Sequence, residues 1–98
     1  EAIGAFKEAV RLNPDSAQSQ YNLGVAYSQT GQWSQAIDAY QAAIALDPNS
    51  ADARYGLGVA YIRTGNNELA RSQRDYLISI DQDAAARLSN QLRPEVRP

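Results

Sequence analysis

Four acidic residues in this sequence have the chemistry to bind a metal or transfer a proton: Asp15, Asp47, Asp81 and Asp83. All four stand at the ends of expected helices, where a carboxylate commonly satisfies free backbone N–H groups. No pair has a spacing that suggests metal binding or acid–base catalysis. The chain has no His and no Cys, so the usual general base and the thiolate ligand are both missing. We therefore expect no enzyme activity, no metal site and no cofactor.

The short motif Gly56-x-Gly58 superficially resembles a phosphate-binding loop. It falls inside an expected helix, follows no strand and is not succeeded by Lys-Ser or Lys-Thr, so a nucleotide site is not indicated. A set of arginines in the second half could form a basic edge, but acidic residues interleave with them and favour a solvated surface: Arg71, Arg74, Arg87, Arg93 and Arg97.

Composition describes an ordinary globular chain that makes at most one small domain. Its 98 residues are 44% hydrophobic and 20% charged, with a net charge of −2. This charge gives no overall attraction to nucleic acid or to an anionic membrane. We therefore expect no nucleic acid partner. No apolar run approaches the roughly 18–20 residues that span a bilayer, so we also expect no membrane insertion. The composition identifies no compartment.

The clearest feature of the sequence is an internal repeat. Residues 21–27 read YNLGVAY and residues 55–61 read YGLGVAY, which places six identical letters 34 positions apart. The match continues on both sides, because residues 13–17 align with residues 47–51 and residues 30–32 align with residues 64–66. A fixed period of this size is typical of stacked supersecondary units that bury their apolar faces against each other.

Each unit is predicted to contain two helices. Residues 34–47 carry apolar side chains with helical spacing, and Pro48 ends that helix. Ser16 and Ser50, each after Asp or Asn, are expected N-caps of the following helix. Gly31 and Gly65 fall at the turn between the two helices of a unit, where a left-handed residue is needed.

Gly24 and Gly58 are different, because both fall in mid-helix. Glycine there costs roughly 1 kcal/mol relative to alanine, so we expect a neighbouring helix to occupy the space of the absent side chain. The small residues Ala36 and Ala70 are the expected contacts.

These motifs resemble those of the tetratricopeptide repeat (TPR) family, whose 34-residue units are helix–turn–helix pairs. The resemblance covers residues 1 to about 81 and is carried by Leu23-Gly24-x-x-Tyr27, Ala36-x-x-x-Tyr40 and Pro48, then by Leu57-Gly58-x-x-Tyr61 with Ala70. The tryptophan of the family pattern is replaced by Gln20 and Arg54. The resemblance implies an all-α fold, a right-handed superhelical stack of antiparallel helix pairs (an α-solenoid) with a C-terminal capping helix.

The repeat divides the chain into five expected segments. They are the second helix of a truncated first TPR (1–14), a complete TPR (15–48), a divergent terminal TPR (49–82), a capping helix (83–93) with Asp83 as its N-cap, and a tail (94–98). In the terminal TPR, Arg74 stands where Phe6 and Tyr40 stand, and Asn67 replaces Trp33. Atypical residues are expected where a repeat faces a cap instead of another repeat. We expect the parent chain to continue upstream of Glu1.

The first helix of each complete repeat has apolar residues on two opposite arcs. One arc, with Leu23, Gly24 and Tyr27, is expected to pack on the second helix of the same repeat. In the resembled family the opposite arc lines a concave groove that binds peptides or partner helices. The residues implied here are Gln18, Tyr21, Asn22, Val25, Gln29, Asp52, Tyr55, Val59, Ile62 and Arg63. Burial of the apolar ones between adjacent first helices is an equally open alternative.

One well-known variant of the family clamps a C-terminal carboxylate with Lys, Asn and Arg on the groove helices. Asn22 occupies one matching position, but Asp52 and Gly56 stand where basic residues would be needed, so such a clamp is not expected. Asn22 against Gly56 is the one difference within the repeated word. It is therefore among the first positions to test if the two repeats contact a ligand differently.

Three hypotheses for the function remain open. The first is a non-enzymatic interaction module that binds a peptide or helix of another protein along the groove. The second is self-association into homo-oligomers through the open N-terminal edge, with Ile3, Phe6 and Val10 as the contact residues. The third is a docking or regulatory appendage of an enzyme encoded upstream.

Overall fold

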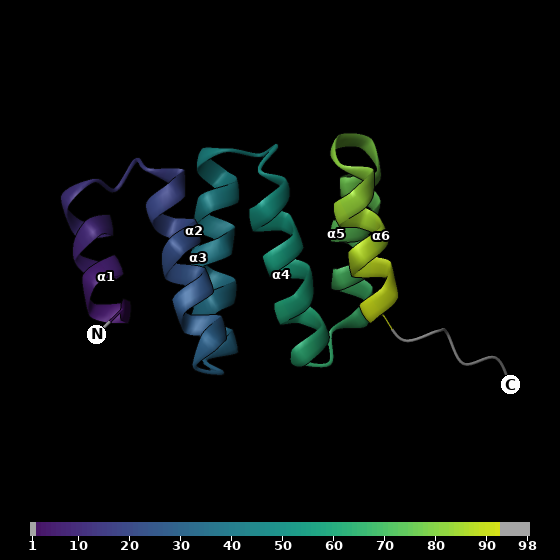
Figure 1. The fold of residues 1–98 in the computed structure, drawn as a ribbon, viewed down its shortest axis with the longest axis horizontal. Helices are drawn as coiled ribbons and strands as arrows, with labels where there is room; N and C mark the ends of the chain where they lie inside the picture. Colours follow the sequence, from purple (N-terminus) through teal and green to yellow (C-terminus); the bar gives the residue numbers. More distant parts are fainter. Residues whose placement is uncertain (1, 93–98) are drawn as a thin grey trace, which may run out of the picture.

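A computed structural model describes residues 2–92 of the chain, and this part is entirely α-helical apart from its turns. Its helices are α1 (Ala2–Leu12), α2 (Ala17–Gln29), α3 (Trp33–Leu46), α4 (Ala51–Arg63), α5 (Asn67–Ile80) and α6 (Gln82–Gln91). They follow one another along the long axis of the molecule, from α1 at one end to α5 and α6 at the other (Figure 1). Consecutive helices contact each other, and α4 also contacts α2 and α6. The predicted all-α class and the stacking of antiparallel helix pairs are confirmed.

The ends of α2 and α4 follow the signals in the sequence. The Ser16 hydroxyl accepts a hydrogen bond from the Ser19 backbone N–H at 3.1 Å, and the Ser50 hydroxyl accepts one from Ala53 at 3.2 Å. Gly31 and Gly65 have φ values of 73° and 82°, which L-residues rarely adopt. The predicted serine caps and glycine turns are therefore confirmed.

The start of α6 differs from the prediction that Asp83 is the N-cap. Asp81 caps α6 instead, and its carboxylate accepts a hydrogen bond from the Ala84 backbone N–H at 3.1 Å. Asp81 also ends α5, where its backbone N–H donates to the Leu77 carbonyl. Because no proline turn separates the two helices, one residue serves both ends, and Asp83 lies within the first turn of α6.

The core contains two clusters of buried alanine, leucine and tyrosine side chains. The larger cluster joins α3, α4 and α5 through Ala36, Tyr40, Ala43, Ala53, Leu57, Tyr61 and Ala70. The second joins α5 to α6 through Leu77, Ala84, Ala85 and Leu88. Many members are alanines with almost no exposed surface, which lets the helix backbones approach closely.

The two mid-helix glycines are contacted by large side chains, so the expectation that Ala36 and Ala70 fill these spaces is wrong. A Cβ atom at Gly24 would lie 2.7 Å from Cε1 of Tyr40, and one at Gly58 would lie 2.5 Å from Cδ2 of Leu88. The two repeats therefore use different residues for the same purpose. In the terminal repeat the filling side chain comes from α6.

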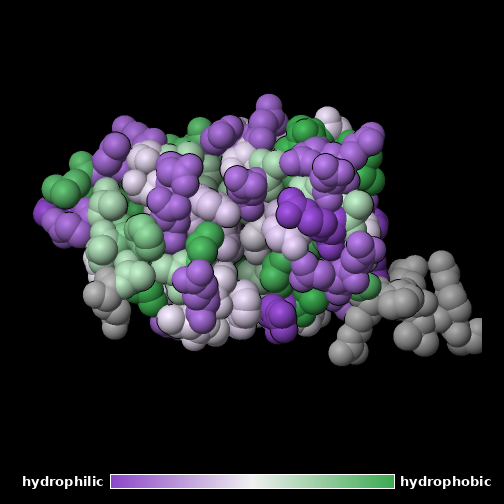
Figure 2. Space-filling model, in the orientation of Figure 1, coloured by the Kyte–Doolittle hydropathy of each residue, from purple (hydrophilic) through white to green (hydrophobic). Residues whose placement is uncertain are grey.

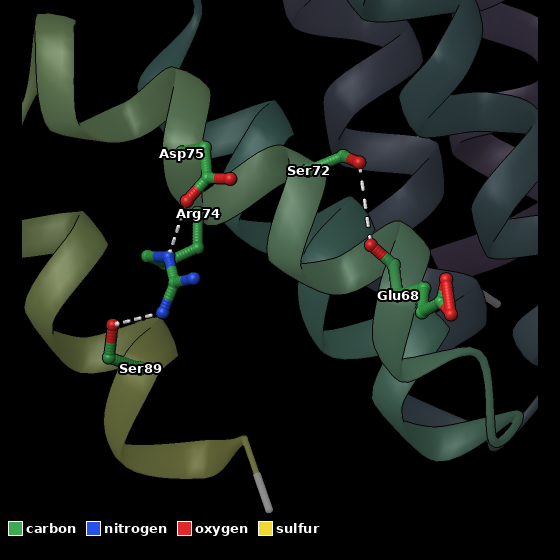
Figure 3. Close-up of polar contacts among 5 residues, drawn as sticks. All are labelled: Glu68, Ser72, Arg74, Asp75 and Ser89. Atoms are coloured by element: carbon green, nitrogen blue, oxygen red, sulfur yellow. Dashed lines mark hydrogen bonds and ion pairs between the residues drawn. The ribbon is translucent and has the colours of Figure 1, made fainter. Parts of the chain in front are cut away.

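Arg74 explains this exchange. It stands 34 residues after Tyr40, and its Nε donates to Asp75 Oδ1 at 2.8 Å while its Nη1 donates to Ser89 Oγ of α6 at 3.4 Å (Figure 3). On the same helix, the Ser72 hydroxyl donates to the Glu68 backbone carbonyl at 3.4 Å. Arg74 therefore forms polar contacts at the end of the stack. An aromatic ring at this position would need a further repeat to pack against.

Candidate functional site

The residues predicted to line a groove lie along α2 and α4 and are here called the first-helix face. Its apolar members and Asn22 are half-buried: Tyr21, Asn22, Val25, Tyr55, Val59 and Ile62. Its remaining members are exposed: Gln18, Gln29, Asp52 and Arg63. The face therefore combines partly accessible apolar surface with exposed polar groups at both ends of the helices.

On α2, the half-buried side chains also contact the core. Tyr21 and Val25 pack against the larger core cluster, and the Tyr21 ring centroid lies 5.9 Å from that of Tyr40 at a tilt of 46°. The Gln18 side-chain amide donates to Asn22 Oδ1 at 2.9 Å. The side chains of Tyr21 and Val25 therefore pack between helices and also remain partly exposed to solvent.

On α4, the first-helix face is flanked by α6, which the sequence reasoning did not connect to it. Tyr55 and Val59 pack against the cluster that contains Leu88. The Gln91 side-chain amide donates to the Tyr55 hydroxyl, and Arg87 Cζ lies 5.2 Å from the centroid of the Tyr55 ring. The sequence predicts a capping helix over residues 83–93, but no local signal shows which helix it covers.

The difference between Asn22 and Gly56 has a packing cause. A Cβ atom at Gly56 would lie 2.5 Å from Cζ and 2.9 Å from the hydroxyl oxygen of Tyr40. One repeat earlier the residue in the place of Tyr40 is Phe6, which has no hydroxyl. From the repeat register we therefore expect a shorter ring opposite Asn22, with more room for a side chain there than at Gly56.

Burial affects the acidity of Tyr21 on this face and of Tyr40, the core residue that Tyr21 contacts. It raises the pKa of Tyr21, and the nearby charges of Asp52 and Tyr40 raise it further. Burial also raises the pKa of Tyr40, against a smaller opposing effect of its hydrogen bond with Ser28. Both hydroxyls therefore remain protonated at neutral pH and can donate hydrogen bonds.

Two clefts open at opposite ends of α4. The larger, of about 730 Å³, is lined by Ile62, Arg63, Gly65, Asn67 and Gln91. The smaller, of about 230 Å³, is lined by Ala17, Gln18, Tyr21, Asp47, Ser50 and Asp52. The structure therefore brings Gln18, Tyr21 and Asp52 together at one end, and Ile62 and Arg63 at the other.

The N-terminal edge is formed by α1, which contains no buried residue. Ile3, Phe6 and Val10 are half-buried, whereas Ala2 and Ala5 beside them are exposed. The residues 34 positions after those two alanines, Ala36 and Ala39, are 0% and 5% exposed because α2 and α4 pack around α3. Figure 2 shows the corresponding pale green patch over α1 at the left end of the molecule.

The acidic side chains of residues 2–92 are dispersed over the molecule. No group of three or more acidic side chains in this range is placed to hold a metal ion. No helix in the same range has both the length and the apolar character needed to cross a membrane.

A row of antiparallel helix pairs with a 34-residue period defines a helical-repeat protein. A family model described as "TPR repeat" matches residues 1–31 and 26–65, so the chain belongs to the TPR family. No curated protein sequence gives a match.

Three solved structures have a fold similar to that of this chain. One is YrrB, described as a TPR protein with an unusual peptide-binding site, with a TM-score of 0.84 and 28% identity over 91% of this chain. Another is MamA, with a TM-score of 0.78 and 30% identity over 91% of this chain. A further structure, of MamA AMB-1, has a TM-score of 0.78 and 25% identity over 94%. The chain spans 47%, 63% and 50% of those three chains, respectively.

Proposed function

We propose that the chain is a non-enzymatic interaction module that binds an extended peptide or a helix of another protein across the first-helix face. The observation that carries this proposal is the partial exposure of apolar side chains beside exposed polar ones on α2 and α4. Such a surface combines apolar contact with hydrogen bonds that orient a ligand. The neighbouring YrrB structure is described as having a peptide-binding site, which supports the same class of ligand.

Particular residues have distinct roles in this proposal. Tyr21 and Tyr55 supply flat, partly exposed rings with little conformational entropy to lose on binding. Gln18 and Gln29 are exposed and supply hydrogen bonds to the backbone of a peptide. Asp52 and Arg63 provide charges of opposite sign at the two ends of α4.

The test begins with peptides selected from a random display library on the immobilised chain. Selected peptides are then measured against a variant in which Tyr21, Tyr55 and Arg63 are all alanine. We expect this variant to lose at least tenfold in affinity, which is about 1.4 kcal/mol. Circular dichroism must show that the variant keeps its helix content.

A matched control replaces exposed residues away from the first-helix face. Lys7, Leu69 and Ile78 are exposed on α1 and α5, and their triple alanine variant should bind as the parent does. Equal binding by both variants, or a library that yields no peptide for the chain, contradicts the proposal.

A second candidate function is self-association through α1, and the exposed alanines at that edge favour it. An uncovered apolar helix face is a surface on which another helix can pack. Ala5→Arg should then abolish a dimer observed by analytical ultracentrifugation, while the exposed Ala45→Arg on α3 should leave it unchanged. A chain that remains monomeric at high concentration contradicts this candidate.

A further inference from the structure

The larger cleft lies where the terminal repeat has Asn67 instead of a tryptophan. Trp33 begins α3, and its ring centroid lies 5.8 Å from Cζ of Arg63. Asn67 begins α5 at the equivalent position, 34 residues later, and lines the cleft. The cleft lies beside the turn at Gly65, and Gln91 of α6 supplies another part of its wall.

Within residues 2–92, the polar side chains that line this cleft are one cation and two amides that can donate hydrogen bonds. Arg63 lines it, and Arg87 lies one helical turn before Gln91 on α6. The ion pairs within residues 2–92 are Arg11 with Glu8 and Arg74 with Asp75, so neither Arg63 nor Arg87 is paired there. The amide groups of Asn67 and Gln91 can donate further hydrogen bonds. Among residues 2–92, no acidic side chain lines the cleft.

Asp52, the acidic residue of the first-helix face, lies at the other end of α4. Asp47 and Asp52 line the smaller cleft beside the start of α4. From Asp52 to Arg63 the helix rises by about 16 Å, at about 1.5 Å per residue. The first-helix face is therefore polarised, and a partner that places acidic groups at the Arg63 end avoids repulsion at the Asp52 end.

We propose that the larger cleft binds a carboxylate side chain of an extended acidic segment in a partner protein. This deepens the proposed function and rests on it. Arg63 forms the charge-assisted hydrogen bonds, Asn67 and Gln91 donate from the walls, and Ile62 contacts the methylene groups of the bound side chain. A guanidinium suits this task because its donors match the geometry of a carboxylate.

The experiment uses two capped synthetic peptides with the same length, one alternating alanine with glutamate and the other alanine with glutamine. In an NMR titration of the isotope-labelled chain, the glutamate peptide should shift the signals of the Gly65 backbone amide and of the Asn67 and Gln91 side-chain amides. The glutamine peptide should not shift them. Arg63→Gln should weaken binding about tenfold. Lys7→Gln removes the same charge at the far end of the molecule and should change affinity less than about twofold.

Ionic strength supplies an independent readout. Affinity for the glutamate peptide should fall when salt rises from about 50 mM to about 500 mM, because screening weakens the interaction of exposed charges. Equal binding of the glutamine peptide, or equal losses from Arg63→Gln and Lys7→Gln, overturns the proposal.

The outcome also separates this proposal from the one on which it rests. Display-selected peptides that need Tyr21 and Tyr55 but neither an acidic residue nor Arg63 would leave the interaction module intact and remove the carboxylate site. Selected peptides that are insensitive to the whole first-helix face would remove both.

Discussion

Cζ of Tyr40 lies 2.5 Å from the place that a Cβ atom on Gly56 would occupy. The same ring lies against Gly24. One side chain of α3 therefore contacts both α2 and α4, and it fits because Gly24 and Gly56 have no side chain. Tyr40 is 3% exposed and belongs to the larger core cluster. The spacing between consecutive first helices therefore depends on this ring and on the two glycines that receive it.

Gly56→Asn tests this relationship by introducing the residue that occupies the equivalent position in α2. A side chain at Gly56 must displace a buried ring, so we expect a loss of about 1–3 kcal/mol in the free energy of unfolding. Urea denaturation followed by circular dichroism measures it.

Gly4→Ala is the matched control, because nothing lies within 4 Å of a Cβ atom there. Alanine is the better helix former, so this change should be stabilising by up to about 1 kcal/mol. A neutral or stabilising Gly56→Asn would show that the ring moves aside without cost.

Leu88→Ala tests whether α6 completes the terminal repeat. Leu88 is fully buried and fills the space over Gly58, so its truncation should cost about 2–5 kcal/mol. Leu69 is 48% exposed, and Leu69→Ala should stay within about 0.5 kcal/mol of the parent. Thermal and urea unfolding that give similar values for the two variants would mean that α6 is not part of the core.

Arg54→Lys tests how the chain manages without the tryptophan of the family pattern. Arg54 Nε donates to the Pro48 carbonyl at 2.8 Å, its Nη1 donates to Gln73 Oε1 at 3.0 Å, and Cζ lies 3.5 Å from the centroid of the Tyr76 ring. Lysine keeps the charge but has neither the planar fork nor the same stacking, so we expect a loss of about 1 kcal/mol.

The control for this change is Arg71→Lys, which alters an arginine of α5 that forms no ion pair within the described range. Its unfolding midpoint in urea should match that of the parent. A tolerated Arg54→Lys would show that charge alone is sufficient at this position.

The raised pKa of Tyr40 predicts sensitivity to alkali. Burial raises this pKa above the ordinary value of 10.0, so the folded state holds the phenolic proton more tightly than the unfolded state does. The associated stability is fully present below pH 10 and is lost as pH rises through the folded-state pKa.

Tyr40→Phe removes this titration at the cost of the hydrogen bond to Ser28, about 1 kcal/mol at neutral pH. Between about pH 8 and about pH 11 the variant should therefore lose less stability than the parent. The two urea midpoints at each pH provide the measurement, and parallel losses in both proteins would refute the assignment.

Much of the fold could be predicted because its signals are local. Ser16, Ser50, Gly31 and Gly65 mark helix ends through their own backbone requirements, and the 34-residue period indicates stacking. The partners of mid-helix glycines could not be read in this way. Tyr40 and Leu88 reach Gly24 and Gly58 from other helices, and no spacing along one helix specifies such contacts.

The first-helix face was only partly predictable for the same reason. Helical spacing places Tyr55 and Val59 on the same arc of α4. Their contact with α6 depends on the direction that the chain takes after Asp81, which helical spacing does not specify. The larger cleft is lined by Asn67, which stands in the place of Trp33, and by Gln91 of α6. A one-dimensional pattern shows the substitution but not the space that it leaves.

The most direct measurement of the central claim is an NMR map of the amide shifts caused by a display-selected peptide on the isotope-labelled chain. We expect the largest shifts along α2 and α4, at Tyr21, Val25, Tyr55 and Arg63 and their neighbours. Shifts confined to α1 or to the outer surfaces of α3 and α5 would contradict the assignment of the first-helix face as the binding surface.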